Sequence, residues 1–139
     1  NDGIDERLFE YLVHSIENTG FYRQLGIKVN KIGAGIAELM VVAGQEHSNP
    51  LGVAHGGFVM GLVDGAMGNA VRSTGIAAVT TAYSAQLLAA APVGQKVVAR
   101  GMVVKKGRNI IFASGEAFCG DDIICKCTGT FFKTGDINI

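Results

Sequence analysis

One carboxylate stands within the most apolar stretch of this chain. Residues 56–71 are apolar or glycine throughout, except for Asp64 and Asn69. An ionised carboxylate in apolar surroundings is costly unless it is paired or serves a chemical purpose. Asp64 is therefore a candidate catalytic group, because perturbed carboxylates gather at active sites. The structural alternative is a carboxylate that reaches a wet interface or binds a neighbouring backbone amide.

A glycine-containing segment leads into this stretch and could supply hydrogen-bond donors. Residues 49–57 read Asn-Pro-Leu-Gly-Val-Ala-His-Gly-Gly and end where a helix is expected to begin. A helix N-terminus offers unpaired N–H groups and positive potential, and glycine lets a ligand approach the backbone closely. We expect the amide of Gly56 or Gly57 to polarise a substrate carbonyl as charge develops on its oxygen. Asp64, in the same site or from a partner subunit, would then act on the carbonyl carbon.

The elements that must position these groups follow from the pattern of apolar residues. Apolar residues recur at helical spacing through residues 4–18, and the apolar run from residue 56 predicts a buried central helix. Glycine, proline and polar residues divide most of the remaining chain into β-rich runs. The expected strands are residues 25–32 and 36–43, joined by a turn at 33–35, and three strands within residues 77–133, with breaks at 92–94, 106–109 and 120–122.

This order of elements predicts an α+β fold in a single domain over residues 1–139. A curved antiparallel sheet wrapped around the central helix would bury its apolar face against that helix. The N-terminal helix would pack across this unit. The 20 glycines suit a bent sheet lying close to a helix. Gly57, Gly61, Asp64 and Gly68 form one stripe on the helix, and we expect Gly61, Gly65 and Gly68 to allow close backbone contact.

Composition and charge exclude several classes of function. Lysine plus arginine and aspartate plus glutamate are equal at 12 each, so no overall field favours nucleic acid or a membrane surface. No apolar run approaches the roughly 20 residues needed to cross a bilayer, and the polar start is unlike a secretory signal. The three cysteines lack metal-binding spacing, so we expect reduced thiols in a cytoplasmic protein. The sequence predicts neither a metal site nor a nucleotide cofactor.

The spacing Asn-Pro-x-Gly-x-x-His-Gly-Gly, followed seven residues later by aspartate, resembles the hotdog-fold acyl-CoA thioesterases of the phenylacetate-degradation (PaaI-like) group. The similarity extends from about Leu25 to Phe132 and includes the turn at residues 106–108. It implies a hotdog fold, in which a curved sheet wraps one long helix, and acyl-CoA hydrolysis without a cofactor. It also implies a homo-oligomer, a dimer or a dimer of dimers, with active sites between subunits.

The resemblance assigns roles to the residues already singled out. Asp64 would be the nucleophile or the general base for water, and the amide of Gly56, together with Gly57, would polarise the thioester carbonyl. Asn49 would position the water or the substrate, and His55 would brace the loop or contact the thioester. In the family, the helix carboxylate comes from one chain and the Asn and His-Gly loop from the other. Even in an enzyme of this kind, His55 is equally a residue that caps the helix or braces the loop, and Asn-Pro is an ordinary turn opener.

Two further groups of residues are assigned by their position in the family. Thr80 or Thr81 falls near the place where related enzymes carry a hydroxyl that assists the water. Residues 82–86 depart from the more polar strand common in the family, so no acyl-pocket contacts are carried over from it. The densest basic turn matches a turn beside the nucleotide in the family and would bind the phosphates of coenzyme A; it consists of Lys106, Gly107 and Arg108, with Lys105 before it. The alternative for this turn is a solvated hairpin tip.

The leading functional prediction is hydrolysis of a small acyl or aryl-acyl coenzyme A thioester. A hotdog dehydratase acting on a 3-hydroxyacyl thioester is an alternative, because a histidine and a helix carboxylate can also move a proton and expel hydroxide. The pair of His55 and Asp64 fits that reaction too, but the run before the helix resembles the thioesterase pattern. A non-catalytic acyl-CoA-binding protein is a second alternative, and the presence of Asp64 argues against it.

Overall fold

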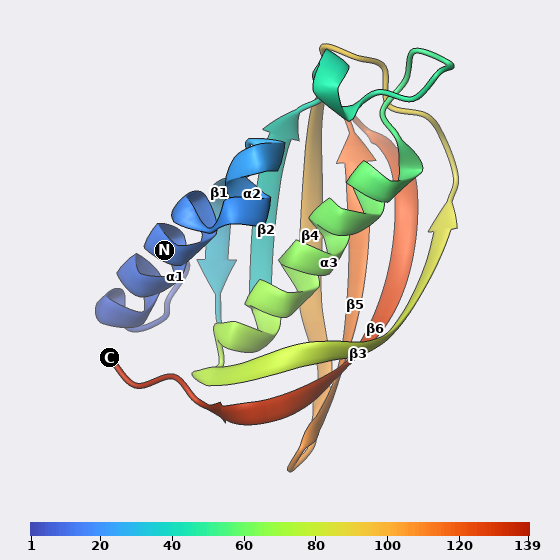
Figure 1. Ribbon diagram of the computed structural model, residues 1–139. Coiled ribbons are helices and arrows are strands. Elements are labelled where there is room, and N and C mark those ends of the chain that lie inside the picture. Colours follow the sequence, from blue (N-terminus) through green and yellow to red (C-terminus); the bar gives the residue numbers. More distant parts are fainter.

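A curved antiparallel sheet with a long helix lying across its concave face forms the body of the protein (Figure 1). The computed structural model describes all residues from 1 to 139. The helices are α1 Glu6–Asn18, α2 Gly20–Leu25, the short 3-10 helix η1 Gln45–His47 and α3 Gly56–Arg72. The strands are β1 Lys28–Gly33, β2 Ile36–Val42, β3 Ile76–Leu87, β4 Lys96–Lys106, β5 Ile110–Cys119 and β6 Asp122–Asp136. The predicted α+β architecture, a sheet around a central helix with an additional N-terminal helix, is confirmed.

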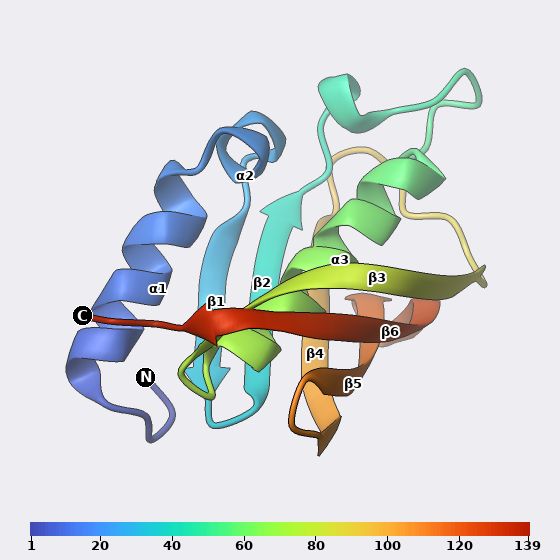
Figure 2. The same ribbon diagram turned by 60° about the horizontal axis from the view of Figure 1, so that its bottom comes forward.

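The strand order is β1-β2-β4-β5-β6-β3, and every neighbouring pair is antiparallel. The prediction of three strands after the central helix is wrong, because residues 77–133 contain four. The first of them, β3, does not pair with β4 but lies beside β6 at the far edge (Figure 2), where Ile76 is opposite Asp136. Local turn signals carry no information about a partner so distant in the sequence. As a result, β3 is an edge strand of the sheet.

Two helices cover the sheet at its β1 end. The predicted N-terminal helix is confirmed as α1, which Asp5 caps by accepting a hydrogen bond from the Leu8 amide at 3.1 Å. The short helix α2 was not predicted, since the sequence pattern placed a strand from residue 25. It ends at Gly26, whose φ of +73° is a left-handed conformation that glycine adopts without strain.

Close approach between α3 and the sheet depends on glycines in the strands. A Cβ atom on Gly101 of β4 would lie 2.5 Å from the Met67 amide nitrogen and in collision with the Ala66 carbonyl. A Cβ atom on Gly115 of β5 would lie 2.6 Å from a methyl group of Val63. These two glycines therefore let the middle of α3 rest directly on the backbone of the sheet.

The predicted close backbone contact at Gly61, Gly65 and Gly68 is wrong, because a Cβ on each would meet only side chains. Gly57, Gly61, Asp64 and Gly68 form the least buried face of α3, while the buried residues of the helix lie on the face toward the sheet. The nearest atoms to a Cβ on Gly61 belong to the side chain of Phe21 in α2. The stripe therefore faces α2 and the β3–β6 edge of the sheet, and Asp64 stands in its middle.

One hydrophobic core of 28 buried residues fills the space between α3, the sheet and α1. Cys125 and Cys127 belong to this core, Cys119 is partly buried, and all three are free thiols, as predicted. None of the helices combines the length and the apolar character needed to cross a membrane.

Candidate functional site

The N-terminus of α3 is capped by a side chain and leaves one amide unoccupied. His55 is the N-cap residue, and its Nδ1 accepts a hydrogen bond from the Gly57 amide at 2.8 Å. Its carbonyl accepts from Phe58 at 3.0 Å and from Val59 at 3.2 Å. The Gly56 amide donates to no group in the chain. Of the two amides expected at an oxyanion hole, that of Gly56 is therefore the free one.

Asn49 organises the loop that leads to this cap. Its Oδ1 accepts hydrogen bonds from the amides of Leu51 at 3.0 Å and Val53 at 3.3 Å. The turn passes through Gly52, whose φ of +80° is readily adopted only by glycine. The Nδ2 group of Asn49 has no partner in the chain, so it remains able to donate to a ligand.

The two polar residues of α3 are satisfied in different ways. Asn69 is 1% exposed, its Nδ2 donates to the Tyr22 hydroxyl at 3.3 Å, and its Oδ1 accepts from Arg72 at 2.8 Å. Asp64 is half-buried and accepts a single side-chain hydrogen bond, from the Thr80 hydroxyl at 2.9 Å. Asn69 therefore completes a structural network, whereas Asp64 keeps most of its hydrogen-bonding capacity free.

The electrostatic setting of Asp64 makes its carboxylate a stronger base. Burial raises the pKa of Asp64 above its ordinary value, and the hydrogen bond from Thr80 lowers it only in part. No lysine, arginine or histidine forms an ion pair with it. A carboxylate with a raised pKa and no cationic partner can accept a proton or attack an electrophile. No three His, Cys, Asp or Glu side chains are grouped so as to hold a metal ion.

A β-bulge separates the two candidate threonines. Thr80 is opposite Phe131 and Ala82 is opposite Thr130, so Thr81 is the extra residue of the bulge. The Thr81 hydroxyl donates to the carbonyl of Thr130 at 3.1 Å, while the Thr80 hydroxyl reaches Asp64. Of the two threonines, Thr80 is therefore the one beside the candidate catalytic carboxylate.

Tyr83 is a residue of this site that the sequence reasoning missed. It follows Thr80 along β3, and its hydroxyl donates to the Met60 carbonyl at 2.9 Å, one turn before Asp64. Burial raises the pKa of Tyr83, so the group stays a neutral hydroxyl. A tyrosine within a strand gives no signal that its hydroxyl will reach a helix carbonyl. Tyr83 thus fixes the separation between β3 and the turn of α3 that carries Asp64.

Asp64 and Gly56 do not meet within one chain. Gly56 and Asn49 lie in the wall of a mostly apolar cleft of about 270 Å³, between the start of α3 and the end of β3. Asp64 lines none of the clefts of the chain. Eight residues separate it from Gly56, which corresponds to about 12 Å along a helix. A small substrate carbonyl bound at the Gly56 amide is out of reach of the same chain's Asp64.

The basic turn lies near the other end of α3. The β4–β5 hairpin, at the bottom of Figure 1, carries Lys106, Gly107 and Arg108, whereas the loop before α3 is at the top. Lys106 Nζ is 3.5 Å from the carbonyl of Thr74, just beyond the C-terminus of α3. Arg108 is exposed and forms no ion pair. Within one chain, the basic turn and the Gly56 amide are therefore at opposite ends of the helix.

The fold and this arrangement of residues define a thioesterase of the hotdog class. Residues 51–126 match the sequence model of the thioesterase superfamily, so the chain belongs to that family and is an enzyme of the thioester hydrolase class. It is 29% identical to acyl-coenzyme A thioesterase 13 of Mus musculus over 136 residues, 95% of this chain and 92% of that protein. These findings confirm the predicted family, the predicted hotdog fold and the predicted class of enzyme.

Solved structures share the fold closely. The Escherichia coli PaaI protein from the phenylacetic acid degradation operon has a TM-score of 0.90, with 22% identity over 98% of this chain and 100% of its own. A Streptococcus pneumoniae thioesterase solved with coenzyme A has a TM-score of 0.78, with 26% identity over 81% of this chain and 91% of its own. The same Streptococcus protein was solved with an aspartate or a threonine replaced by alanine, at two positions 16 residues apart.

Proposed function

We propose that the protein hydrolyses acyl-coenzyme A thioesters at active sites formed by two copies of the chain. The observation that carries this proposal is the pair of Asp64 and Thr80, in which a half-buried carboxylate has one hydroxyl donor and no cationic partner. The two residues are 16 positions apart, the spacing of the aspartate and threonine replaced in the Streptococcus thioesterase. The substrate class is supported by the name of the mouse relative and by the coenzyme A in that bacterial structure.

Each residue of the proposed site has a role that its contacts support. The free amide of Gly56 would hold the thioester oxygen as negative charge develops on it. Asp64 would attack the carbonyl carbon or take a proton from an attacking water, while Thr80 orients its carboxylate. Asn49 would position the water or the substrate through its unpaired Nδ2, and His55 would hold the helix start in place.

In the general-base route, Asp64 takes a proton from water and later returns it to the leaving group. The water oxygen forms a bond to the carbonyl carbon, and its proton passes to the Asp64 carboxylate. The tetrahedral intermediate then collapses, breaks the carbon–sulfur bond and expels coenzyme A as a thiolate. The proton held by Asp64 neutralises that thiolate, so the free acid and coenzyme A leave and the carboxylate is regenerated.

Two copies of the chain would bring the separated groups together. The strand β3 has a free edge and exposes apolar side chains, with Val79 52% and Leu87 50% exposed. Antiparallel pairing of β3 with its own copy would bring the partner's Leu87 toward the half of the strand that carries Thr80. Since Leu87 lies against the start of α3 in its own chain, the partner's Gly56 would approach Asp64.

The same pairing would place the basic turn beside the substrate. The turn lies near the C-terminus of α3, where the partner's helix start would arrive. Lys106 and Arg108 would bind the phosphates of coenzyme A. Gly107 would shape the turn through the hydrogen bond that its amide donates to the Ile110 carbonyl at 2.9 Å. Gly57 and Thr81 would line the path of the substrate. The proposed oligomer is a dimer or a dimer of such dimers, and three free cysteines favour the reducing cytoplasm.

Thiol release from a panel of acyl-CoA esters tests the catalytic roles. Asp64→Asn should lower the rate by at least about a hundredfold. Gly56→Pro removes the amide donor at a helix position that suits proline, and should lower the rate by about 10² to 10³. Gly56→Ala is the matched control, because it adds the same crowding against the Leu87 side chain but keeps the N–H.

The outcome decides between reaction classes. Loss of thiol release in the Asn and Pro variants, with retention in the Ala variant, supports hydrolysis at this site. Consumption of a 3-hydroxyacyl thioester without free thiol would instead identify a dehydratase. Tight binding of every ester with no turnover would identify a binding protein and refute the proposal.

Mixing two inactive variants tests the site between chains. In a mixed dimer, Asp64→Asn contributes an intact Gly56 and Gly56→Pro contributes an intact Asp64, so one of the two sites is complete. Random mixing makes half of the dimers mixed, and activity should return to about one quarter of the wild-type value. If each site were built within one chain, the mixture would stay inactive.

A further inference from the structure

His47 connects the loop before α3 to the first turn of that helix. The residue lies in η1, and its side chain is 4% exposed. Its carbonyl accepts the His55 amide at 2.7 Å, and its ring stacks on Phe58 with ring centres 4.1 Å apart and planes 12° apart. Its Nδ1 accepts from the Gly44 amide at 2.9 Å. One buried residue, through its side chain and its backbone carbonyl, thus holds both ends of the segment that contains Asn49 and Gly56.

The hydrogen bond from Gly44 fixes the tautomer of the His47 ring. Because Nδ1 accepts a hydrogen bond, the neutral ring carries its proton on Nε2. That N–H is buried and has no acceptor, since the nearest carboxylate oxygen, on Glu46, is 3.8 Å away. A buried donor without a partner lowers stability. The ring face and Nδ1 make the two contacts of the side chain, and these must offset the loss.

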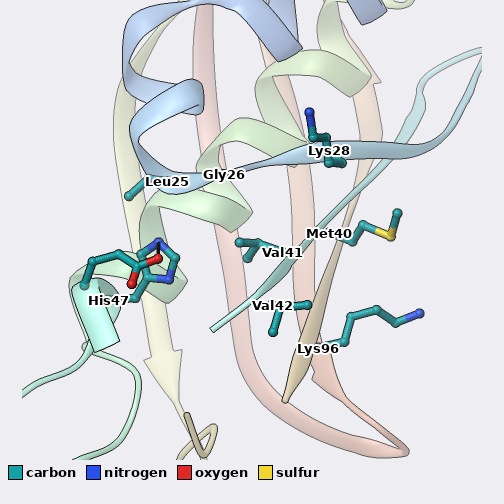
Figure 3. Close-up of a pocket in the computed structure, with 9 residues that line it drawn as sticks. Leu25, Gly26, Lys28, Met40, Val41, Val42, His47 and Lys96 are labelled. Atoms are coloured by element: carbon teal, nitrogen blue, oxygen red, sulfur yellow. Dashed lines mark ion pairs between the residues drawn. The ribbon is translucent and has the colours of Figure 1, made fainter. Parts of the chain in front are cut away.

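The surroundings of the ring leave the loop free to move if these contacts are lost. His47 lies in the walls of two adjoining clefts of about 330 and 270 Å³. Figure 3 shows the larger cleft, with His47 on one side and Lys28 and Lys96 on the other. The ring itself is buried between the two clefts. Its hydrogen bond and its stacking contact therefore hold the loop where the clefts interrupt the packing on both flanks.

We propose that His47 is a positioning residue that places the Gly56 amide for catalysis, an inference that rests on the proposed function. His47 does not touch Gly56 or Asp64. It sets their approach indirectly, because the Gly44 hydrogen bond to its ring fixes the start of the loop, and the ring stacked on Phe58, with the backbone hydrogen bond to His55, holds its end. A displacement of about 1 Å in a catalytic group can lower a rate by about a hundredfold.

Two substitutions separate the positioning role from a structural one. His47→Phe keeps a ring for stacking on Phe58 and removes both the unpaired N–H and the Nδ1 acceptor. We expect its Tm to stay near wild type, while kcat falls at least about tenfold and KM stays within about twofold. His47→Asn supplies an oxygen in place of Nδ1 but loses the stacked ring. We expect its Tm to fall, while kcat returns to within about threefold of wild type.

The discriminating result is that the more stable of the two variants is the less active one. A purely structural His47 would make kcat follow Tm, so that the Phe variant would be the more active one. That outcome, or a wild-type kcat in the Phe variant, would overturn the proposal.

A measurement that does not depend on catalysis tests the role of His47 separately from the proposed function. Hydrogen–deuterium exchange should speed up in His47→Phe at the amides of Phe58 and Val59, which bond to the carbonyl of His55. The Ser73 amide, bonded at the far end of α3, should exchange at the wild-type rate. If wild type releases no thiol but this exchange pattern holds, the proposed function fails while the link from His47 to the helix start stands. Unchanged exchange at Phe58 and Val59 would refute that link directly.

Discussion

Gly101→Ala is expected to lift the catalytic helix off the sheet. The added Cβ would lie 2.5 Å from the Met67 amide nitrogen and in collision with the Ala66 carbonyl. Both neighbours are backbone atoms in the middle of α3, so no side-chain rotation can relieve the contact. The helix must therefore shift by a sizeable fraction of an ångström, and the buried contacts on either side of it loosen.

The expected loss of stability in Gly101→Ala follows from the type of contact. Overpacking a close-packed core costs about 1 to 3 kcal/mol, and a backbone collision belongs at the upper end of that range. A folding entropy of about 2.1 cal/mol/K for each of 139 residues gives about 0.29 kcal/mol/K, so 3 kcal/mol corresponds to a fall in Tm of about 10 °C. Because α3 carries Asp64, thiol release from acyl-CoA should fall as well.

The matched control is Gly135→Ala, at a position of β6 where a Cβ would meet nothing within 4 Å. Both variants lose the same flexibility in the unfolded chain, a change that favours the folded state by about 0.4 to 1 kcal/mol. Differential scanning calorimetry should be run at equal protein concentration, since association also shifts Tm. Equal Tm values for the two variants would refute the close approach of α3 to β4.

Three further predictions concern charge. Thr80→Val removes a hydrogen-bond donor that favours the ionised carboxylate, so the pKa of Asp64 should rise. The acid limb of the pH profile of kcat/KM should therefore move to higher pH. An acid limb at the wild-type pH would show that Thr80 has no role in the reaction. Because the pKa of Asp64 is raised on folding, its ionisation destabilises the protein above that pKa. Asp64→Asn should therefore raise Tm at neutral pH, by an amount that shrinks as pH falls toward the ordinary value of 3.8. Replacing Lys106 or Arg108 by Ala should raise KM about tenfold for coenzyme A esters but not for short thioester analogues, and Lys28→Ala is the control. Equal effects on both kinds of substrate would show that the turn does not bind the phosphates.

The sequence was informative where structure is set locally. The apolar run that begins at Gly56 predicted α3 to within one residue of its end, because its composition permits only a buried helix. The hairpin turns at residues 33–35 and 106–109 were predicted from glycine and polar residues. Asp64 was recognisable as the one carboxylate in that run. Thr80 was named beside Thr81 only by its position in the family, and its hydrogen bond to Asp64 was not predicted.

Structural features that depend on residues far apart in the sequence could not be predicted from it. The helix α2 has six residues, too few to be stable alone, and it exists because Phe21 and Tyr22 pack against Gly61 and Gly65 of α3. The edge position of β3 depends on a partner strand about fifty residues later in the sequence. The role of Gly101 could not be assigned either, since a glycine in a strand does not reveal which backbone approaches it.

The rigidity of α3 explains why this chain would need a partner for catalysis. A helix fixes the separation of Gly56 and Asp64 at about 12 Å, and no loop motion can shorten a distance set by eight consecutive helical residues. The same helix nevertheless supplies both groups, so a two-fold axis beside β3 would create two complete sites from two incomplete ones. In such an arrangement, dissociation removes the active site itself without unfolding either subunit. Specific activity should therefore fall on dilution in parallel with the dimer measured by sedimentation, and a monomer that keeps full activity would contradict the two-chain site.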